Sequence, residues 1–167
     1  MPLLQRGRED LENSMGSPKS KYKQFASNRK ARHDYDILER MEAGISLLGT
    51  EVKSVRNGKV QLKDSYVEIR GTEAWLVGAH IGPYSHGNRE NHDPERPRKL
   101  LLNRREIDRI FGRTTIQGQT CIPLSVYLKG NRIKVEIALA KGKRLYDKRQ
   151  AEKEKLLDRE AREAMGE

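Results

Sequence analysis

The stretch LSVYLKGNRIKVEIAL, residues 124–139, carries the strongest fold signal in this chain. Apolar and polar residues alternate along both halves of it, on either side of Gly130-Asn131. A period of two is typical of a β-strand with one buried face, and a glycine–asparagine pair suits a tight turn. The alternating apolar positions are Leu124, Val126, Leu128, Ile133, Val135, Ile137 and Leu139. The stretch therefore predicts an antiparallel hairpin that supplies the centre of a barrel core.

Two regions further upstream share this pattern. Residues 33–48 begin with Tyr35 and Ile37 alternating with acids, which predicts a long first strand, and Gly44 inside it predicts a bend. Residues 64–70 and 73–81 predict a second hairpin around Gly71-Thr72. Its return strand would place one set of side chains on a common face: Trp75, Val77, Ala79 and Ile81.

Two short helices are predicted between the strands. Thr50 can cap the first, with Gly58 just past its end. Asn103 and Glu106 form a capping box for the second, which we expect to end at Gly112. Residues 82–98, between the second hairpin and this helix, are predicted to form a long polar loop.

Strands dominate this order and lack the regular βαβ rhythm of a parallel sheet. The predicted fold is mainly β: residues 28–140 form one domain, a small, partly open antiparallel barrel of the oligonucleotide-binding (OB) type with two or three short helices. Residues 1–27 lack sustained periodicity and are predicted to be a disordered basic arm. Residues 141–167 are rich in helix formers but have a thin apolar stripe. We therefore expect a basic tail that is disordered when free and helical when bound.

The charge of the chain indicates a polyanionic partner. The 167 residues carry 34 lysines and arginines against 24 acids, a net charge of +10. Nucleic acid is the commonest such partner at this size, and an anionic membrane surface is the competing one. No run approaches the roughly 20 consecutive apolar residues of a membrane-spanning helix, so we expect a cytoplasmic protein with no membrane partner. The lone Cys121 is predicted to be buried in a strand.

Motifs for catalysis or metal binding are weak in this sequence. His80, His86, His92 and Asp93 fall in or near the polar loop, without the spacing that aligns metal ligands. No nucleophile elbow, phosphate-binding glycine loop or zinc signature occurs. We therefore expect no metal, no cofactor and no enzyme activity. A small ribonuclease that uses the loop histidines is the enzyme alternative.

Two basic segments are the candidate binding elements. The first has Arg29, Lys30, Arg32 and His33 immediately before a predicted strand, which would give phosphate contacts a rigid edge. The second, residues 141–149, combines several cations with a tyrosine that can stack on a base. Its candidate residues are Lys141, Lys143, Arg144, Tyr146, Asp147, Lys148 and Arg149. A solvated charge run is the alternative interpretation of both segments.

Six short motifs in a fixed order resemble small protein B, the bacterial family that binds transfer-messenger (SsrA) RNA. They are Asn28-Arg29-Lys30-Ala31-Arg32-His33-Asp34-Tyr35, Glu42-Ala43-Gly44, Glu51-Val52-Lys53-Ser54, Asp64-Ser65-Tyr66, Arg98-Lys99-Leu100-Leu101-Leu102-Asn103, and Lys141-Gly142-Lys143 with Asp147-Lys148-Arg149. The resemblance implies a barrel that binds the tRNA-like domain of this RNA and enters stalled ribosomes with it, in place of an anticodon stem. It implies no catalysis. The tail would reach the decoding centre and the empty mRNA channel.

By position, the resemblance also implies that Glu42, Leu101 and Lys134 belong to the RNA-binding face. Lys134 lies between Ile133 and Val135, so alternation points it away from the core. Glu42 could accept a hydrogen bond from a base edge or hold a neighbouring side chain in register. Leu101, in a run of three leucines, would be a core residue by sequence alone. The remaining alternative is a basic ribosomal or single-strand-binding protein, and we expect a monomer.

Overall fold

The computed structural model describes residues 22–85, 91–143 and 145–166, with the side chains of residues 145–148 left out of the description. The strands are β1 (Lys23–Ser27), β2 (Tyr35–Ile45), β3 (Val60–Gln61), β4 (Tyr66–Arg70), β5 (Glu73–Val77), β6 (His80–Ile81), β7 (Arg98–Leu101), β8 (Thr120–Lys129) and β9 (Arg132–Gly142). The helices are α2 (Arg29–Asp34), α3 (Gly49–Arg56), α4 (Arg104–Thr115) and α5 (Leu145–Ala164).

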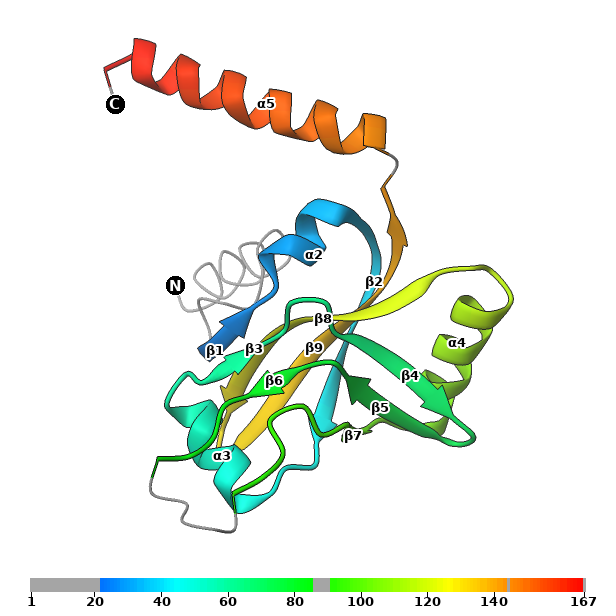
Figure 1. Ribbon diagram of the computed structural model, residues 1–167. Coiled ribbons are helices and arrows are strands. Elements are labelled where there is room, and N and C mark those ends of the chain that lie inside the picture. Colours follow the sequence, from blue (N-terminus) through cyan, green and yellow to red (C-terminus); the bar gives the residue numbers. More distant parts are fainter. Residues whose placement is uncertain (1–21, 86–90, 144, 167) are drawn as a thin grey trace, which may run out of the picture.

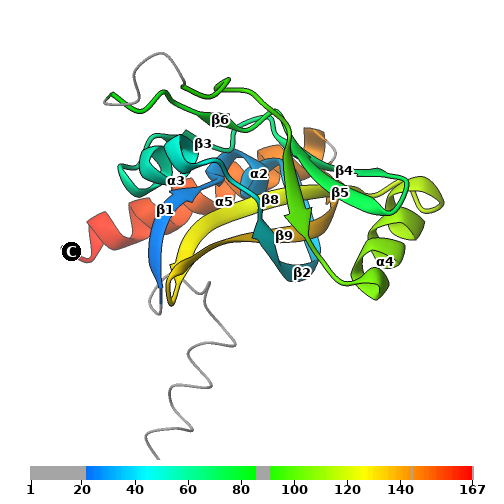
Figure 2. The ribbon, with the colours of Figure 1, turned by 90° about the horizontal axis from the view of Figure 1, so that it is seen from below.

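Seven of these strands form one antiparallel sheet in the order β1-β8-β9-β2-β7-β5-β4, and β3 pairs with β6 beside it. The sheet curls so that β4 comes back towards β8. Figure 2 shows β4 and β5 lying across from β9 and β2, with α4 at the open end between them. A curled antiparallel sheet with short helices at its openings is a small, partly open barrel, so the predicted OB-like fold class is confirmed.

The β8–β9 hairpin is the centre of this sheet, as its alternation predicted. Gly130 turns the chain with a φ of 62°, and Lys129 pairs with Arg132 across the turn. Four of the predicted core positions on β9 are buried inside the barrel: Ile133, Val135, Ile137 and Leu139. Cys121 is also buried there, as predicted.

One position of the hairpin departs from the predicted alternation. A register shift between Pro123 and Ser125 turns Leu124 away from Val126 and into a second, smaller apolar cluster on the opposite face. Ala31 of α2 packs in this second cluster, so the short helix covers the outside of the sheet. Both faces of β8 and β9 are therefore buried over part of their length.

The first ordered elements differ from the prediction. Strand β1 lies inside the segment predicted to be disordered, where it pairs with β8. The cations expected immediately before a strand lie on helix α2, and the strand that follows begins at Tyr35 rather than at His33. The reason is the side chain of Asn28, which accepts from Ala31 N at 3.1 Å and donates to Leu62 O and Pro123 O at 3.3 and 3.0 Å. These hydrogen bonds stabilise a helix that is too short to persist alone.

Two predicted helix boundaries are also wrong. Helix α3 begins at Gly49 rather than after Thr50, because the Glu51 carboxylate accepts from Leu48 N at 2.8 Å. Helix α4 has the predicted Asn103–Glu106 capping box but continues through Gly112 to Thr115.

In β2 a register irregularity lies between Ile37 and Glu39, and the bend predicted at Gly44 stays a prediction. A Cβ at Gly44 would approach Leu101 Cβ to 3.1 Å.

The buried face of β5 was assigned incorrectly. Ala74 and Leu76 face the core, whereas Trp75 and Val77 are half-buried. Gly78 follows with a φ of 85°, which breaks the alternation, and Ala79 and Ile81 then return to the core. A single left-handed residue is enough to exchange the faces of a strand.

The tail is helical in this structure. Helix α5 projects away from the barrel and passes above α2 (Figure 1), where His33 Nε2 lies 3.0 Å from Glu152 Oε1. The described side chains of α5 are almost all exposed. This is the helical form expected for the bound tail, and its disorder in the free protein stays a prediction. None of the described helices has the length and apolar character needed to cross a membrane.

Candidate nucleic-acid interface

The residues predicted to bind RNA lie at two ends of one strand. Helix α2, with Arg29, Lys30, Arg32 and His33, precedes Tyr35 at the start of β2. Leu101 and Lys134 pair with Gly44 near its end. Nine residues of extended chain span about 30 Å. The structure therefore separates the predicted residues into two surfaces, which we call the α2 surface and the β7–β9 surface.

The β7–β9 surface contains a hollow of about 320 Å³. Leu101 and Lys134 line it, together with two cations that the sequence did not single out, Arg56 and Arg132. Apolar side chains line it as well: Ile45, Leu47, Val52 and Ile133. A hollow lined by apolar side chains and three cations can contact both a base and the surrounding phosphates.

Leu101 faces solvent in this hollow. It is 56% exposed, whereas its neighbour Leu100 is 2% exposed and lies in the core. The alternation along β7 starts at Arg98, which is fully buried, so every second residue points outward. The interpretation of Leu101 from sequence alone, as a core residue, is wrong. The exposed position is the one that the resemblance implies.

Arg98 is fixed by a buried ion pair. Its Nε donates to Glu51 Oε2 at 2.6 Å, and its two terminal nitrogens donate to the carbonyls of Ala79, Asp93 and Pro94. Burial alone would raise the pKa of Glu51, but hydrogen bonds from Arg96, Leu48 N and Arg98 outweigh it and hold that pKa below its usual value. This pair links α3 to the start of β7 and so positions Leu101.

Glu42 lies beside the hollow and holds other side chains in place. The Tyr127 hydroxyl donates to Glu42 Oε2 at 2.5 Å, and Lys129 Nζ donates to Oε1 at 3.1 Å. Partial burial raises the pKa of Glu42, but Tyr127, Lys129 and the charge of Lys134 together lower it below its usual value. The geometry favours the positioning role over direct acceptance from a base edge, because both carboxylate oxygens already have donors.

An aromatic pair continues this cluster onto β1. The rings of Tyr22 and Tyr127 stack with centroids 5.4 Å apart, and Lys129 Nζ lies 5.8 Å from the Tyr22 ring. Tyr127 also pairs across the hairpin with Lys134. The Glu42 carboxylate thus links a stacked aromatic pair to the cation that borders the hollow.

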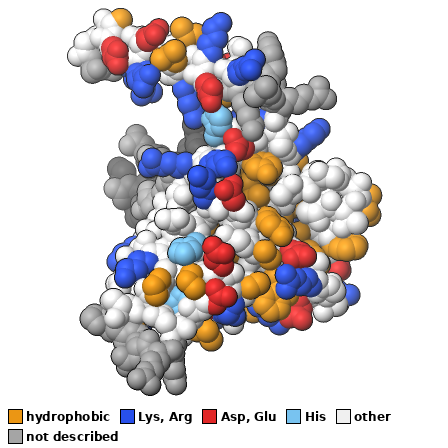
Figure 3. Space-filling view, in the orientation of Figure 1, with side chains coloured by type: hydrophobic (Ala, Val, Ile, Leu, Met, Phe, Trp, Pro, Cys, Tyr) orange, Lys and Arg blue, Asp and Glu red, His pale blue; other side chains and the backbone are white. Residues whose placement is uncertain are grey.

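On the α2 surface, Arg29 and Lys30 are exposed, and Arg32 and His33 are half-buried. Lys30 Nζ pairs with Asp64 Oδ1 at 2.9 Å, and His33 Nδ1 lies 3.0 Å from Asp34 Oδ1. Within the described residues, Nε and Nη2 of Arg32 have no hydrogen-bond partner. Figure 3 shows Lys and Arg side chains gathered beside α2, with acids among them. Short helices can present cations to phosphate in this way.

The structure describes only part of the predicted tail site. Lys141 is exposed at the end of β9, and the backbone N–H of Lys143 donates to Asp34 O at 2.9 Å. Tyr146, Asp147 and Lys148 lie in α5, but their side chains are outside the described residues, as is Arg144. Arg149 is exposed on the same helix. Their role in binding stays a prediction.

The histidines have structural partners where they are described. His92 is buried, with Thr50 Oγ1 2.8 Å from its Nδ1 and Ile81 O 2.9 Å from its Nε2. His80 Nδ1 lies 3.9 Å from Glu95. His86 lies outside the described residues. In the described part of the chain, no group of three or more His, Cys, Asp or Glu side chains could hold a metal ion.

A partly open OB-like barrel with a cation-rimmed apolar hollow defines a small nucleic-acid-binding protein. The SmpB protein family matches residues 25–167. SsrA-binding proteins of Carboxydothermus hydrogenoformans and Geobacillus thermodenitrificans are 59% and 53% identical, over 75% and 90% of this chain and 85% and 97% of theirs. That of Clostridium botulinum is 60% identical over 81% of this chain and 87% of its own. The chain belongs to the SmpB family.

A solved structure agrees with this assignment. A chain from the structure described as "tmRNA-SmpB: a journey to the center of the bacterial ribosome" superposes with a TM-score of 0.61 and 45% identity. The match covers 72% of this chain and 85% of that one.

Proposed function

We propose that this protein binds the tRNA-like domain of transfer-messenger RNA and delivers it to stalled bacterial ribosomes for trans-translation. The observation that carries the proposal is the β7–β9 surface, where Leu101 and Lys134 border one apolar hollow with Arg56 and Arg132. It lies in a chain that is 53–60% identical to SsrA-binding proteins. The protein acts as an adaptor in the bacterial cytoplasm, as a monomer, and supplies no catalytic group.

Lys134, Leu101 and Glu42 have different parts in this binding. Lys134, Arg56 and Arg132 contact phosphates around the hollow, and Leu101 packs against an unstacked base. Glu42 is a positioning residue, since it holds Tyr127 and Lys129 beside Lys134. The protein stands in place of an anticodon stem, and the tail residues 141–149 engage the decoding centre of the small subunit and the empty mRNA channel.

The test is the affinity for transfer-messenger RNA across a salt series. Phosphate contacts release counterions, so the affinity of the wild-type protein should fall steeply between about 50 and 200 mM salt. Lys134→Ala should weaken binding and reduce the slope of log affinity against log salt by about one. Lys153→Ala, an exposed lysine on α5, is the matched control and should change neither.

Three other results would refute the proposal. Affinity that hardly varies with salt would exclude a binding mode built on phosphate contacts. Sequencing of the RNA that copurifies from cells separates the remaining alternatives: one dominant transfer-messenger RNA supports the adaptor, and bulk ribosomal RNA would indicate a ribosomal component. RNA cleavage that survives repurification and disappears in His92→Ala would indicate the nuclease.

A further inference from the structure

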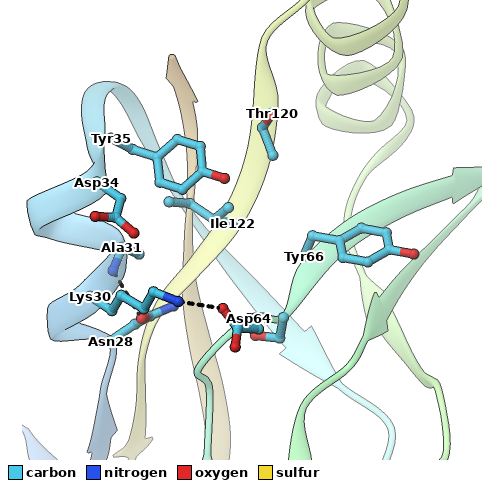
Figure 4. A pocket seen from close by; sticks show the side chains of 10 residues that line it. Asn28, Lys30, Ala31, Asp34, Tyr35, Asp64, Tyr66, Thr120 and Ile122 are labelled. Atoms are coloured by element: carbon cyan, nitrogen blue, oxygen red, sulfur yellow. Dashed lines mark hydrogen bonds and ion pairs between the residues drawn. The ribbon is translucent and has the colours of Figure 1, made fainter. Parts of the chain in front are cut away.

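A second hollow lies on the α2 surface, and Lys30, one of the residues predicted to bind RNA, lines it. It encloses about 260 Å³ between α2, the turn before β4, and the first half of β8. Figure 4 shows Tyr35 on one side, Tyr66 on the other, and Ile122 and Thr120 of β8 between them. The other lining residues are Asn28, Lys30, Ala31, Asp34, Asp64 and Ser65. We call this hollow the tyrosine pocket.

The pocket joins two segments that are far apart in the sequence. Asn28 is 5% exposed, caps α2, and donates to the carbonyls of Leu62 and Pro123, which fixes the helix against the turn before β4. In that turn Asp64 has a φ of 61°, the only positive φ of a described residue other than glycine. A Cβ at Gly78 would approach Asp64 O to 3.1 Å, so the turn also needs the glycine behind it. The walls are therefore held in place by the fold.

The chemistry of the walls suits a planar heterocycle with hydrogen-bond donors. Figure 4 shows the Tyr35 ring pointing into the hollow and the Tyr66 ring pointing away from it, so the Tyr35 ring and the apolar side chains of Ala31 and Ile122 can cover a face of a base. The polar lining residues include Asp34 and Asp64, whose carboxylates accept and do not donate when ionised. A phosphate would be repelled directly beside these acids, whereas the amino and ring N–H groups of a base would be accepted there.

The surroundings and the size define the ligand further. Drug-sized ligands occupy pockets of about 300–1,000 Å³, so a hollow of 260 Å³ admits one base rather than a stretch of strand. Arg29 and Lys30 lie on the same helix and can contact the phosphates on either side of that base. Lys30 is exposed and bound to Asp64 only by a solvated ion pair. It can therefore turn to a phosphate while Asp64 accepts from the base.

From these observations we propose that the tyrosine pocket binds a single unstacked guanine of the RNA that the protein engages, with the Tyr35 ring covering one of its faces and Asp64 accepting from its Watson–Crick edge. Guanine fits because it presents two adjacent donors, N1–H and N2–H₂, to one carboxylate. This inference rests on the proposed function, since it assigns a second contact to the same RNA-binding protein. The guanine belongs either to transfer-messenger RNA or to ribosomal RNA.

The first test uses the full chain, with nucleotides as the probe, followed by backbone amide chemical shifts. Guanosine 5′-monophosphate at millimolar concentration should shift the amides of Ser65, Tyr66 and Thr120. Inosine 5′-monophosphate, which has the same phosphate but lacks the N2 amino group, should bind about tenfold more weakly, as expected for one hydrogen bond to a charged group. Adenosine and cytidine monophosphates should bind more weakly than guanosine monophosphate.

Two variants separate stacking from edge recognition. Asp64→Asn keeps the left-handed turn, because asparagine tolerates this conformation as well as aspartate does. This substitution should reduce the affinity for guanosine monophosphate to the affinity that the wild-type protein has for inosine monophosphate. Tyr35→Ala should abolish binding of every nucleotide, whereas Tyr35→Phe, which keeps the ring, should bind like wild type. Tyr84→Ala removes a tyrosine of the distant loop and is the control.

Binding of the large RNAs identifies the source of the guanine. If it belongs to transfer-messenger RNA, Tyr35→Ala lowers affinity for that RNA. If it belongs to ribosomal RNA, Tyr35→Ala leaves that affinity unchanged and lowers retention on ribosomes. The inference is overturned if guanosine monophosphate shifts no pocket amide, or if all nucleotides bind alike, in a protein that still binds transfer-messenger RNA. Failure of the wild-type protein to bind that RNA would instead refute the proposed function.

Discussion

Replacing Arg98 by methionine should be one of the most destabilising single substitutions in this barrel. Arg98 and Glu51 are both 0% exposed, and the guanidinium also donates to three backbone carbonyls. Methionine keeps the length of the apolar stem but removes every donor. The substitution leaves Glu51 with Arg96 and Leu48 N as partners and removes one hydrogen bond from each of the three carbonyls. Asp93 O keeps the N–H of Arg96 as a donor, and Pro94 O keeps the N–H of Ile81.

The magnitude follows from these losses. Removing one partner of a buried ion pair costs about 3–5 kcal/mol. The remaining donors to Glu51 reduce this cost. Each of the three carbonyls loses a hydrogen bond, which adds about 1 kcal/mol to the cost. We expect a loss of about 4 kcal/mol in the free energy of unfolding. For a chain of 167 residues this lowers the melting temperature by about 10–15 °C.

The effect should depend on pH in a defined direction. The pKa of Glu51 in the folded protein is lowered, so its contribution to stability is fully present above its unfolded pKa of about 4.3. That contribution is lost as the pH falls through the folded value. The difference in stability between wild type and Arg98→Met should therefore be largest at neutral pH and should narrow below about pH 4.3.

Thermal and urea unfolding, followed by circular dichroism from pH 7 to pH 3, measure both effects. Arg104→Met is the matched control, because Arg104 forms an ion pair with Asp108 in which both side chains are largely exposed. It should change stability by less than about 1 kcal/mol. A loss below about 1 kcal/mol in Arg98→Met, or a difference from wild type that does not change with pH, would refute the assignment of this pair as the link between α3 and β7.

Four further predictions concern the binding surfaces and the core. Leu101→Ser should weaken binding of transfer-messenger RNA several-fold in a gel-shift assay without lowering the melting temperature, since Leu101 is 56% exposed; unfolding would contradict this. Glu42→Gln should weaken the same binding less than Lys134→Ala does, because glutamine can still accept from the Tyr127 hydroxyl, and an equal loss would argue for direct contact of Glu42 with RNA. Alanine at all three of residues 147–149 should leave RNA affinity intact but abolish tagging of peptides on stalled ribosomes. The tail of the free protein should give amide signals typical of disorder. Normal tagging by the triple variant, or a stably docked helix in the free protein, would overturn the assignment of the tail. Burial raises the pKa of Cys121 to about 12, so its thiol should resist alkylation at pH 8 until the protein is unfolded with urea.

The elements that could be predicted from the sequence depend on residues close together in the chain. The β8–β9 hairpin follows from alternation around Gly130-Asn131, and the capping box of α4 needs only residues 103–106. Both are local patterns, so single-sequence reasoning finds them. The outward direction of Lys134 follows from the same alternation.

Interactions between residues far apart in the sequence determine the features that local patterns did not predict. Helix α2 exists because Asn28 donates to carbonyls 34 and 95 residues away, and neither bond leaves a local pattern. The exposure of Leu101 follows from Arg98, whose partner Glu51 is 47 residues earlier. The tyrosine pocket likewise needs Tyr35 and Tyr66, which come from separate strands, to lie at one hollow. The sequence by itself thus determined the β-rich barrel, its central hairpin and its affinity for polyanions, because these depend on period and charge. Only the tertiary structure decided which cations share a surface and where a base can enter, because these depend on buried polar side chains whose partners are set by chain closure.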